Sequence, residues 1–219
     1  MTQPSASIED YLGAIYRLHP GNDRPLPLGE LQEHFGFSPI SIHEMIQKLE
    51  QRGLVDYLPY KGVSLTEKGY IMAAALVRRH RVWECFLTDA LQVPIDEAHD
   101  LAGDLEHAAP DWITERLFTY LQQPEACPHG NAIGELAAIP AELSIDRGAV
   151  GKAYLITHIF PENRESLQMA RRTGLLPGES IRITGRTDIE TTIEIRNQQK
   201  SFVSEDLNCF WGMEITDGT

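Results

Sequence analysis

The chain has 219 residues, 42% hydrophobic and 23% charged, an ordinary composition for a soluble globular protein. It shows no apolar run long enough to cross a bilayer and no signal peptide, so we expect a cytoplasmic protein with no membrane partner. The formal net charge is −13, but the first 82 residues hold nine basic and nine acidic side chains. A nucleic-acid partner is therefore not excluded for that first part, because phosphate contacts depend on local charge.

The first predicted elements follow one another in a characteristic order. Hydrophobic residues at helical spacing predict a helix over 7–19, "SIEDYLGAIYRLH", and a short second helix in "LGELQEHFG". Ser38 as N-cap, Pro39 at the first helical position and Gly53 at the end predict a third helix. The stretches "LVDYL" and "VSLT" around "PYKG" predict a two-stranded hairpin. This order predicts a winged helix-turn-helix domain over residues 1–75, whose third helix enters the major groove of double-stranded DNA.

The DNA contacts are expected near the start of that third helix and on the hairpin. Hydroxyl and imidazole groups there can donate to base edges or phosphates, and lysines can contact phosphates. For Lys48 a plain solvated position is an equally good interpretation. The predicted DNA-contacting residues are Ser38, Pro39, Ser41, His43, Glu44, Lys48 and Lys61.

Three helical segments follow the hairpin. A long helix is predicted from Thr66 to Pro94, a second over about 95–109 and a third over about 111–121. These segments predict a helical domain over residues 76–148.

The pattern changes near the C-terminal end. From about Tyr154 the chain alternates between apolar and polar residues, in "SIRITGR", "TTIEIRN" and "SFVSEDL", with turn residues between these stretches. This alternation predicts an SH3-like β-barrel over residues 149–219. The expected fold class is therefore mainly α with a small β part.

Histidine and glutamate side chains gather on two of the predicted helices. His99, Glu106 and His107 share one face of the second helix, and apolar side chains take the opposite face. His80 and Glu84 stand one turn apart on the long helix before it. Solvation or hydrogen bonding to neighbours accounts for any single pair. A divalent cation would satisfy imidazole and carboxylate groups from both helices together, and spacing alone leaves both interpretations open.

Five stretches in order resemble the iron- and manganese-dependent repressors, the family of the diphtheria toxin repressor and the manganese transport regulator. They are "EDYLGAIYRL", "GLVDYLPYKGVSLTEKG", "RRHRVWECFLTDAL", "HDLAGDLEH" and "GLLPGESIRI". The resemblance covers nearly the whole chain. It implies a winged-helix domain, a helical dimerisation domain and a C-terminal SH3-like domain. It also implies a homodimer that uses a divalent metal as co-repressor and binds operator DNA to block promoters of metal-uptake genes.

The resemblance also implies a primary metal site. Its N-terminal ligand is aspartate in manganese-type members and methionine in iron-type members. The residues that match this site are Asp10, His80, Glu106 and His107. Two positions depart from the family pattern. The family usually has Cys or Glu where this chain has Gly103, and a further manganese-type ligand falls on Gly13.

A second metal site is implied by "CPHG". In streptococcal-type members the matching cysteine and histidine join a glutamate of the long helix and an acid of the SH3-like domain. The corresponding residues are Cys127, His129, Glu84 and either Glu162 or Glu165. Iron-type members instead build this site from the residues matching His80, Glu84 and His99. The division of His80 and His99 between the two sites therefore stays open.

The donor types indicate which metals the protein takes. A primary site of carboxylate and imidazole without sulfur suits Mn(II) first and Fe(II) next, and Zn, Co or Cd could substitute in vitro. The sequence contains no "HExxH", no phosphate-binding glycine loop and no nucleophile elbow, so we expect no enzyme. A metal-dependent activator, a DNA-binding protein with a structural metal and, less favoured, a di-metal enzyme are the alternatives.

Overall fold

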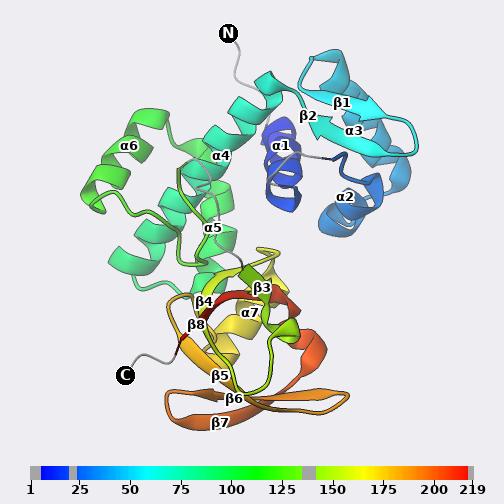
Figure 1. Ribbon diagram of the computed structural model, residues 1–219. Helices are drawn as coiled ribbons and strands as arrows, with labels where there is room; N and C mark the ends of the chain where they lie inside the picture. The colour runs from blue at the N-terminus through cyan, green and yellow to red at the C-terminus, as the bar shows by residue number, and fades with distance from the viewer. Residues whose placement is uncertain (1–5, 20–23, 135–141, 217–219) are drawn as a thin grey trace. The chain divides into compact units, whose positions relative to one another are not determined.

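The chain divides into two compact units. The structure, a computed structural model, describes residues 6–19, 24–134 and 142–216 (Figure 1). Unit 1 comprises Met1–His80 and Glu106–Ala109, and unit 2 comprises Arg81–Leu105 and Pro110–Thr219. Among the described residues, no helix combines the length and the apolar character that a membrane span requires. The predicted division into domains 1–75, 76–148 and 149–219 stays a prediction.

Unit 1 contains the predicted winged helix-turn-helix. Its elements are α1 (Ala6–Leu18), α2 (Leu28–Phe35), α3 (Pro39–Gln51), β1 (Val55–Leu58), β2 (Gly62–Leu65) and the first part of α4 (Glu67–Cys85). As expected, Ser38 caps α3, because its side chain accepts a hydrogen bond from the Ser41 amide at 3.2 Å. Leu12, Ile15, Ile42 and Ile46 lie in one buried core with residues of β1 and β2. This core fixes the recognition helix α3 against α1 and the wing.

The wing is held by a third segment of chain beside β2. Leu26 and Val63 form an antiparallel bridge with backbone hydrogen bonds of 2.8 and 2.9 Å. The bridge brings the Leu26 carbonyl against Gly62, where an added Cβ would lie 2.1 Å from the Leu26 oxygen. Gly62 also has φ +129°, which L side chains rarely adopt. Only glycine fits at this start of β2.

Replacing Gly62 with alanine should therefore destabilise unit 1 by more than about 2 kcal/mol, because clash and backbone strain add. Urea denaturation followed by circular dichroism measures the change. Gly29 in α2 is the matched control, since a Cβ there meets no atom within 4 Å. Gly29→Ala should stabilise the protein by about 0.5–1 kcal/mol. Equal effects of the two substitutions would contradict the close approach at Gly62.

The helices of unit 2 differ from prediction at one point. The long helix predicted from Thr66 to Pro94 is not uniform: α4 ends at Cys85 and a π-helical turn, η1 (Phe86–Ala90), follows. The Thr88 hydroxyl donates to the Glu84 carbonyl at 2.9 Å, and such back-bonding to the preceding turn distorts helices. The other two predicted helices are found as α5 (Ile95–Ala108) and α6 (Asp111–Tyr120).

The C-terminal part of unit 2 confirms the SH3-like expectation. Its antiparallel sheet has the order β3-β8-β4-β5-β6-β7 and, in the described residues, does not close into a full barrel (Figure 1). The strands are β3 (Glu142–Ser144), β4 (Ala153–Ile159), β5 (Ser180–Arg186), β6 (Glu190–Ile195), β7 (Gln198–Val203) and β8 (Phe210–Ile215). Short 3₁₀ turns occupy Ile145–Arg147 and Ser204–Cys209. The strand predicted in "SFVSEDL" therefore ends at Val203.

One helix lies between two strands of this sheet in the sequence, and it was not predicted. Helix α7 (Arg164–Thr173) lies between β4 and β5, and Leu167 and Ala170 are buried in the core of the sheet. The Asn163 side chain caps it by accepting from the Ser166 amide at 2.9 Å, and Gly174 ends it in the left-handed conformation. This helix follows directly on the segment that carries Glu162.

Candidate metal centres

Three predicted ligands come together inside unit 1. Ligand atoms of Asp10, Glu106 and His107 all lie within 4.8 Å of one another, and we call these residues the first cluster. Asp10 stands on α1, whereas Glu106 and His107 stand in the last turn of α5. His107 Nε2 lies 2.7 Å from Asp10 Oδ1 and 3.4 Å from Glu106 Oε1. The first cluster therefore joins the first helix to the end of α5 through one imidazole and two carboxylates.

Glu9 orients the imidazole of the first cluster, a role that sequence reasoning missed. Its Oε2 lies 2.7 Å from His107 Nδ1, and its Oε1 lies 3.5 Å from Arg79. Burial lowers the pKa of His107, but hydrogen bonds to Glu9 and Asp10 and the charge of Glu106 outweigh it, so the pKa is raised. A carboxylate on Nδ1 fixes the ring so that Nε2 faces Asp10 and Glu106. The only available signal was its position next to Asp10.

His80 lies beside the first cluster rather than in it. Its Nδ1 is 2.8 Å from Glu106 Oε2, and both side chains are only 3% exposed. The resemblance implied His80 as a ligand of the primary site. In the structure His80 contacts the outer oxygen of Glu106, which leaves Oε1 of that carboxylate facing His107.

The two glycines that depart from the family pattern have different surroundings. A Cβ on Gly13 would lie 3.1 Å from Leu76 Cδ2, so close packing of α1 on α4 favours glycine there. A Cβ on Gly103 would meet no atom within 4 Å, so no steric reason requires this glycine. Neither position supplies a ligand atom.

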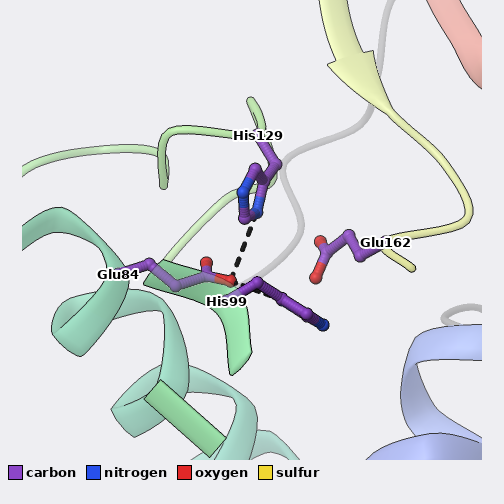
Figure 2. A group of neighbouring side chains, drawn as sticks. All are labelled: Glu84, His99, His129 and Glu162. Atoms are coloured by element: carbon purple, nitrogen blue, oxygen red, sulfur yellow. Dashed lines mark hydrogen bonds and ion pairs between the residues drawn. The ribbon is translucent and has the colours of Figure 1, made fainter. Parts of the chain in front are cut away.

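Four further residues converge inside unit 2. Ligand atoms of Glu84, His99, His129 and Glu162 all lie within 4.8 Å of one another, and we call these residues the second cluster. They come from four segments: α4, α5, the loop after α6 and the loop after β4 (Figure 2). Glu84 Oε1 lies 2.8 Å from His99 Nδ1 and 3.2 Å from His129 Nδ1. Long-range folding thus brings two carboxylates and two imidazoles to one buried point.

The surroundings of His129 prepare it as a ligand through Nδ1. Its Nε2 lies 3.3 Å from the Ile95 carbonyl oxygen, so Nε2–H donates there and Nδ1 faces Glu84. Burial lowers the pKa of His129, but the Glu84 charge and hydrogen bonds with Cys127 and Glu84 raise it well above the usual value. A backbone carbonyl on the second ring nitrogen is the arrangement found around histidines that bind metals.

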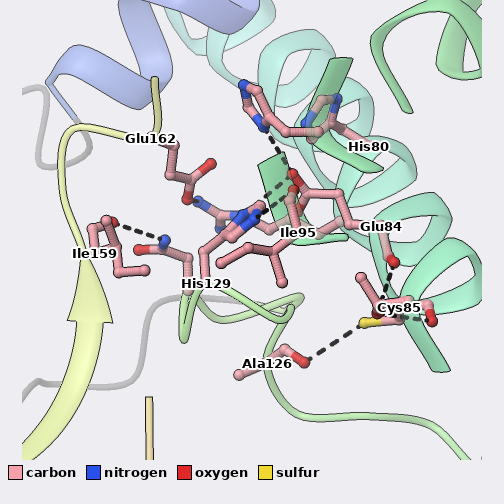
Figure 3. A network of polar contacts seen from close by, with 12 residues as sticks. His80, Glu84, Cys85, Ile95, Ala126, His129, Ile159 and Glu162 are labelled. Atoms are coloured by element: carbon pink, nitrogen blue, oxygen red, sulfur yellow. Dashed lines mark hydrogen bonds and ion pairs between the residues drawn. The ribbon is translucent and has the colours of Figure 1, made fainter. Parts of the chain in front are cut away.

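The structure separates the remaining candidates for the second site. Glu162 is in the second cluster, whereas Glu165 is exposed in the first turn of α7 and outside it. Cys127 is also outside it, although the resemblance implied a thiolate ligand there. Burial first of all raises the pKa of the Cys127 thiol to about 11 in the metal-free protein. Cys85 is buried too, and its Sγ donates to the Ala126 carbonyl (Figure 3).

Both clusters fit a divalent cation by their donor atoms. The Glu84 and Glu162 side chains are 0% and 4% exposed, and two carboxylates so close together in a buried place repel each other unless a cation lies nearby. Neither cluster contains sulfur. Oxygen and imidazole nitrogen together suit Mn(II) and Fe(II) better than soft metals.

The predicted DNA-contacting residues all belong to unit 1. Five of them are on or next to the first turns of α3, Lys48 is in its last turn, and Lys61 is in the wing. His43 is half-buried with its ring against Tyr57 at 5.4 Å between centroids. The exposed residues are Ser38, Pro39, Ser41, Glu44, Lys48 and Lys61.

Comparisons with known proteins agree with this arrangement. The sequence profile described as "Iron dependent repressor, N-terminal DNA binding domain" matches residues 4–63. The profile described as "Iron dependent repressor, metal binding and dimerisation domain" matches residues 66–135. Together the two profiles span more than half of the chain.

Individual proteins extend the match. An uncharacterized HTH-type transcriptional regulator of Methanocaldococcus jannaschii is 38% identical over 54% of this chain and 95% of its own. The diphtheria toxin repressor of Corynebacterium efficiens is 28% identical over 90% of this chain and 76% of its own. A solved "Manganese-dependent transcriptional repressor complex with manganese" has a TM-score of 0.84 and 27% identity, and covers 95% of this chain and 100% of its own. The chain therefore belongs to the iron-dependent repressor family of metal-dependent transcriptional repressors.

Proposed function

We propose that this protein is a homodimeric repressor that requires Mn(II), with Fe(II) as the next candidate, to bind operator DNA at promoters of metal-uptake genes. One observation carries the proposal: Asp10, Glu106 and His107 converge in the unit that contains the recognition helix. A solved structure that resembles this one is described as a complex with manganese, which supports Mn(II) as the first choice. The family profiles support DNA binding and dimerisation.

The first cluster is proposed to act as the metal switch. A bound divalent cation would supply the positive charge that lets adjacent carboxylates stay together. Without metal the two carboxylates of Asp10 and Glu106 share the single nitrogen His107 Nε2, whose raised pKa reflects the negative charge around it. Asp10 is 45% exposed and stands on α1, so it is the ligand with most freedom to leave. A cation that binds Asp10 together with the ligands on α5 would hold α1 in place. Helix α3 packs against α1 and would be held with it.

The second cluster is proposed as a second metal site. Glu84, His99, His129 and Glu162 supply two oxygens and two nitrogens, and Cys127 is not needed to complete four donors. The four residues come from segments far apart in the sequence. Binding at this site would therefore stabilise unit 2 against unfolding, because the unfolded chain cannot present the same ligands together.

An anaerobic DNA-binding titration with Mn(II), Fe(II), Zn(II) and Co(II) tests the proposal. The chelator-stripped protein should bind a promoter fragment about 100-fold more weakly than the Mn(II)-loaded protein, near the upper end of typical coupling between two ligands. The measurement is a gel-retardation or fluorescence-anisotropy titration at fixed salt. Equal affinity with and without metal would reject metal control of DNA binding.

A further inference from the structure

An arginine lies directly beside the second cluster. Arg81 is on α4, and its Nη2 donates to Glu162 Oε1 at 3.2 Å. Its Nη1 donates to the Ala132 carbonyl at 2.6 Å. The Arg81 and Glu162 side chains are 9% and 4% exposed. A guanidinium is therefore held inside unit 2 by one carboxylate of the second cluster and by one backbone carbonyl.

These two contacts of Arg81 involve segments that carry ligands. Ala132 is three residues after His129, in a loop closed by the Cys127 amide donating to the Asn131 carbonyl at 2.9 Å. Glu162 lies in the loop between β4 and α7, and Figure 3 shows it close to His129 and Glu84. Arg81 thus occupies one carboxylate oxygen of Glu162, Oε1.

Arg81 would lie next to any cation in the second cluster. It pairs with Glu162, and its charge is permanent because guanidinium does not lose its proton in proteins. A divalent cation in the second cluster would share Glu162 with Arg81. Its two positive charges would then lie close to a third one in a poorly solvated place, where repulsion is strong.

We propose that Arg81 is an internal cation that competes with divalent metal for Glu162, and so weakens the affinity of the second cluster. The proposal rests on the second cluster being a metal site. In the metal-free protein Arg81 keeps the buried Glu162 carboxylate neutralised. The protein accordingly stays folded without metal, and the second site fills only at higher metal concentration than its donor atoms alone would require.

Two substitutions separate charge from geometry. Arg81→Gln removes the charge but keeps a polar side chain, and Arg81→Lys keeps the charge but loses the planar fork. Both are made in the full chain with Glu106→Gln, so that Mn(II) binding reports the second cluster. Arg116→Gln, at an exposed arginine of α6, removes the same charge elsewhere and is the matched control.

Calorimetric titration with Mn(II) should show about 10-fold tighter binding for Arg81→Gln, the effect of one neighbouring charge at short range. Arg81→Lys and Arg116→Gln should stay within about threefold of the parent protein. The melting temperature of metal-free Arg81→Gln should fall, and its rise on adding Mn(II) should exceed that of the parent.

Four outcomes would overturn the proposal. They are unchanged or weaker Mn(II) binding by Arg81→Gln, equal tightening in both Arg81 variants, equal tightening in Arg116→Gln, and failure of Arg81→Gln to fold even with Mn(II). Glu84→Gln, measured in parallel, tests the site itself. If Glu84→Gln binds Mn(II) as the parent does, the second cluster is not a metal site, whatever Arg81 does.

Discussion

Glu106→Gln should abolish the Mn(II) stimulation of operator binding while leaving a folded protein. The amide keeps the shape of the side chain, but it is neutral and presents one oxygen instead of two. Both carboxylate oxygens are used, because Oε2 lies 2.8 Å from His80 and Oε1 lies 3.4 Å from His107. Loss of an outer partner of a ligand costs about 10- to 100-fold in metal affinity, so loss of the ligand itself should exceed about 100-fold. Fluorescence anisotropy with and without Mn(II) measures the effect.

Two neighbouring substitutions make this result specific. Asp104→Asn removes an exposed carboxylate from the same helix and should leave the Mn(II) response unchanged. Glu9→Gln should give an intermediate loss of about 10-fold, since Glu9 orients His107 without joining the first cluster. A normal Mn(II) response in both Glu106→Gln and Asp10→Asn would refute the proposed switch at the first cluster.

Glu84→Gln should have the largest effect on stability. The Glu84 side chain is 0% exposed, and its Oε1 faces the imidazoles of His99 and His129. Removing one partner of a buried charged group costs about 3 kcal/mol or more, so the metal-free protein should lose about that much free energy of unfolding. The variant should also lose the second-site part of the metal stabilisation, about 2.7 kcal/mol when Mn(II) is at 100 times its Kd.

Urea denaturation with and without Mn(II) checks both parts of this prediction. Glu125→Gln, at an exposed glutamate in the loop before His129, is the control and should change stability by no more than about 0.5 kcal/mol. If Glu84→Gln matches the control in metal-free buffer, the carboxylate does not stabilise the two histidines. If Mn(II) still stabilises it as much as the parent, the second cluster does not bind the ion.

Local signals predicted much of the fold. Ser38 and Pro39 predicted the start of α3, and the alternation in "SIRITGR" predicted β5 with the bounds Ser180–Arg186. Helix α7 was missed because strands were expected throughout this region, although Asn163 and Gly174 are ordinary capping residues. The break after Cys85 could not be predicted, because it depends on how Thr88 bonds back to the preceding turn.

The candidate sites were predictable only in part, and α5 shows why. His99, Glu106 and His107 all stand on α5, but His99 belongs to the second cluster and the other two to the first. Seven or eight residues of helix rise about 11 Å, which is too far for one ion to bridge. Periodicity gives the direction of a side chain around the helix axis. A metal site also needs its ligands at nearly the same position along that axis. Asp10 and Glu162 were identified as candidate ligands through the resemblance, and the role of Glu9 was identified only in the structure.

The burial of all three cysteines has a consequence for redox chemistry. Cys85, Cys127 and Cys209 are free thiols in buried positions, and burial first of all raises the pKa of Cys127 and of Cys209 to about 11. Peroxide attacks thiolates, so these sulfurs should react slowly at neutral pH. Brief exposure to peroxide at neutral pH should therefore leave these three thiols intact, and their titration with a thiol reagent after unfolding would show it.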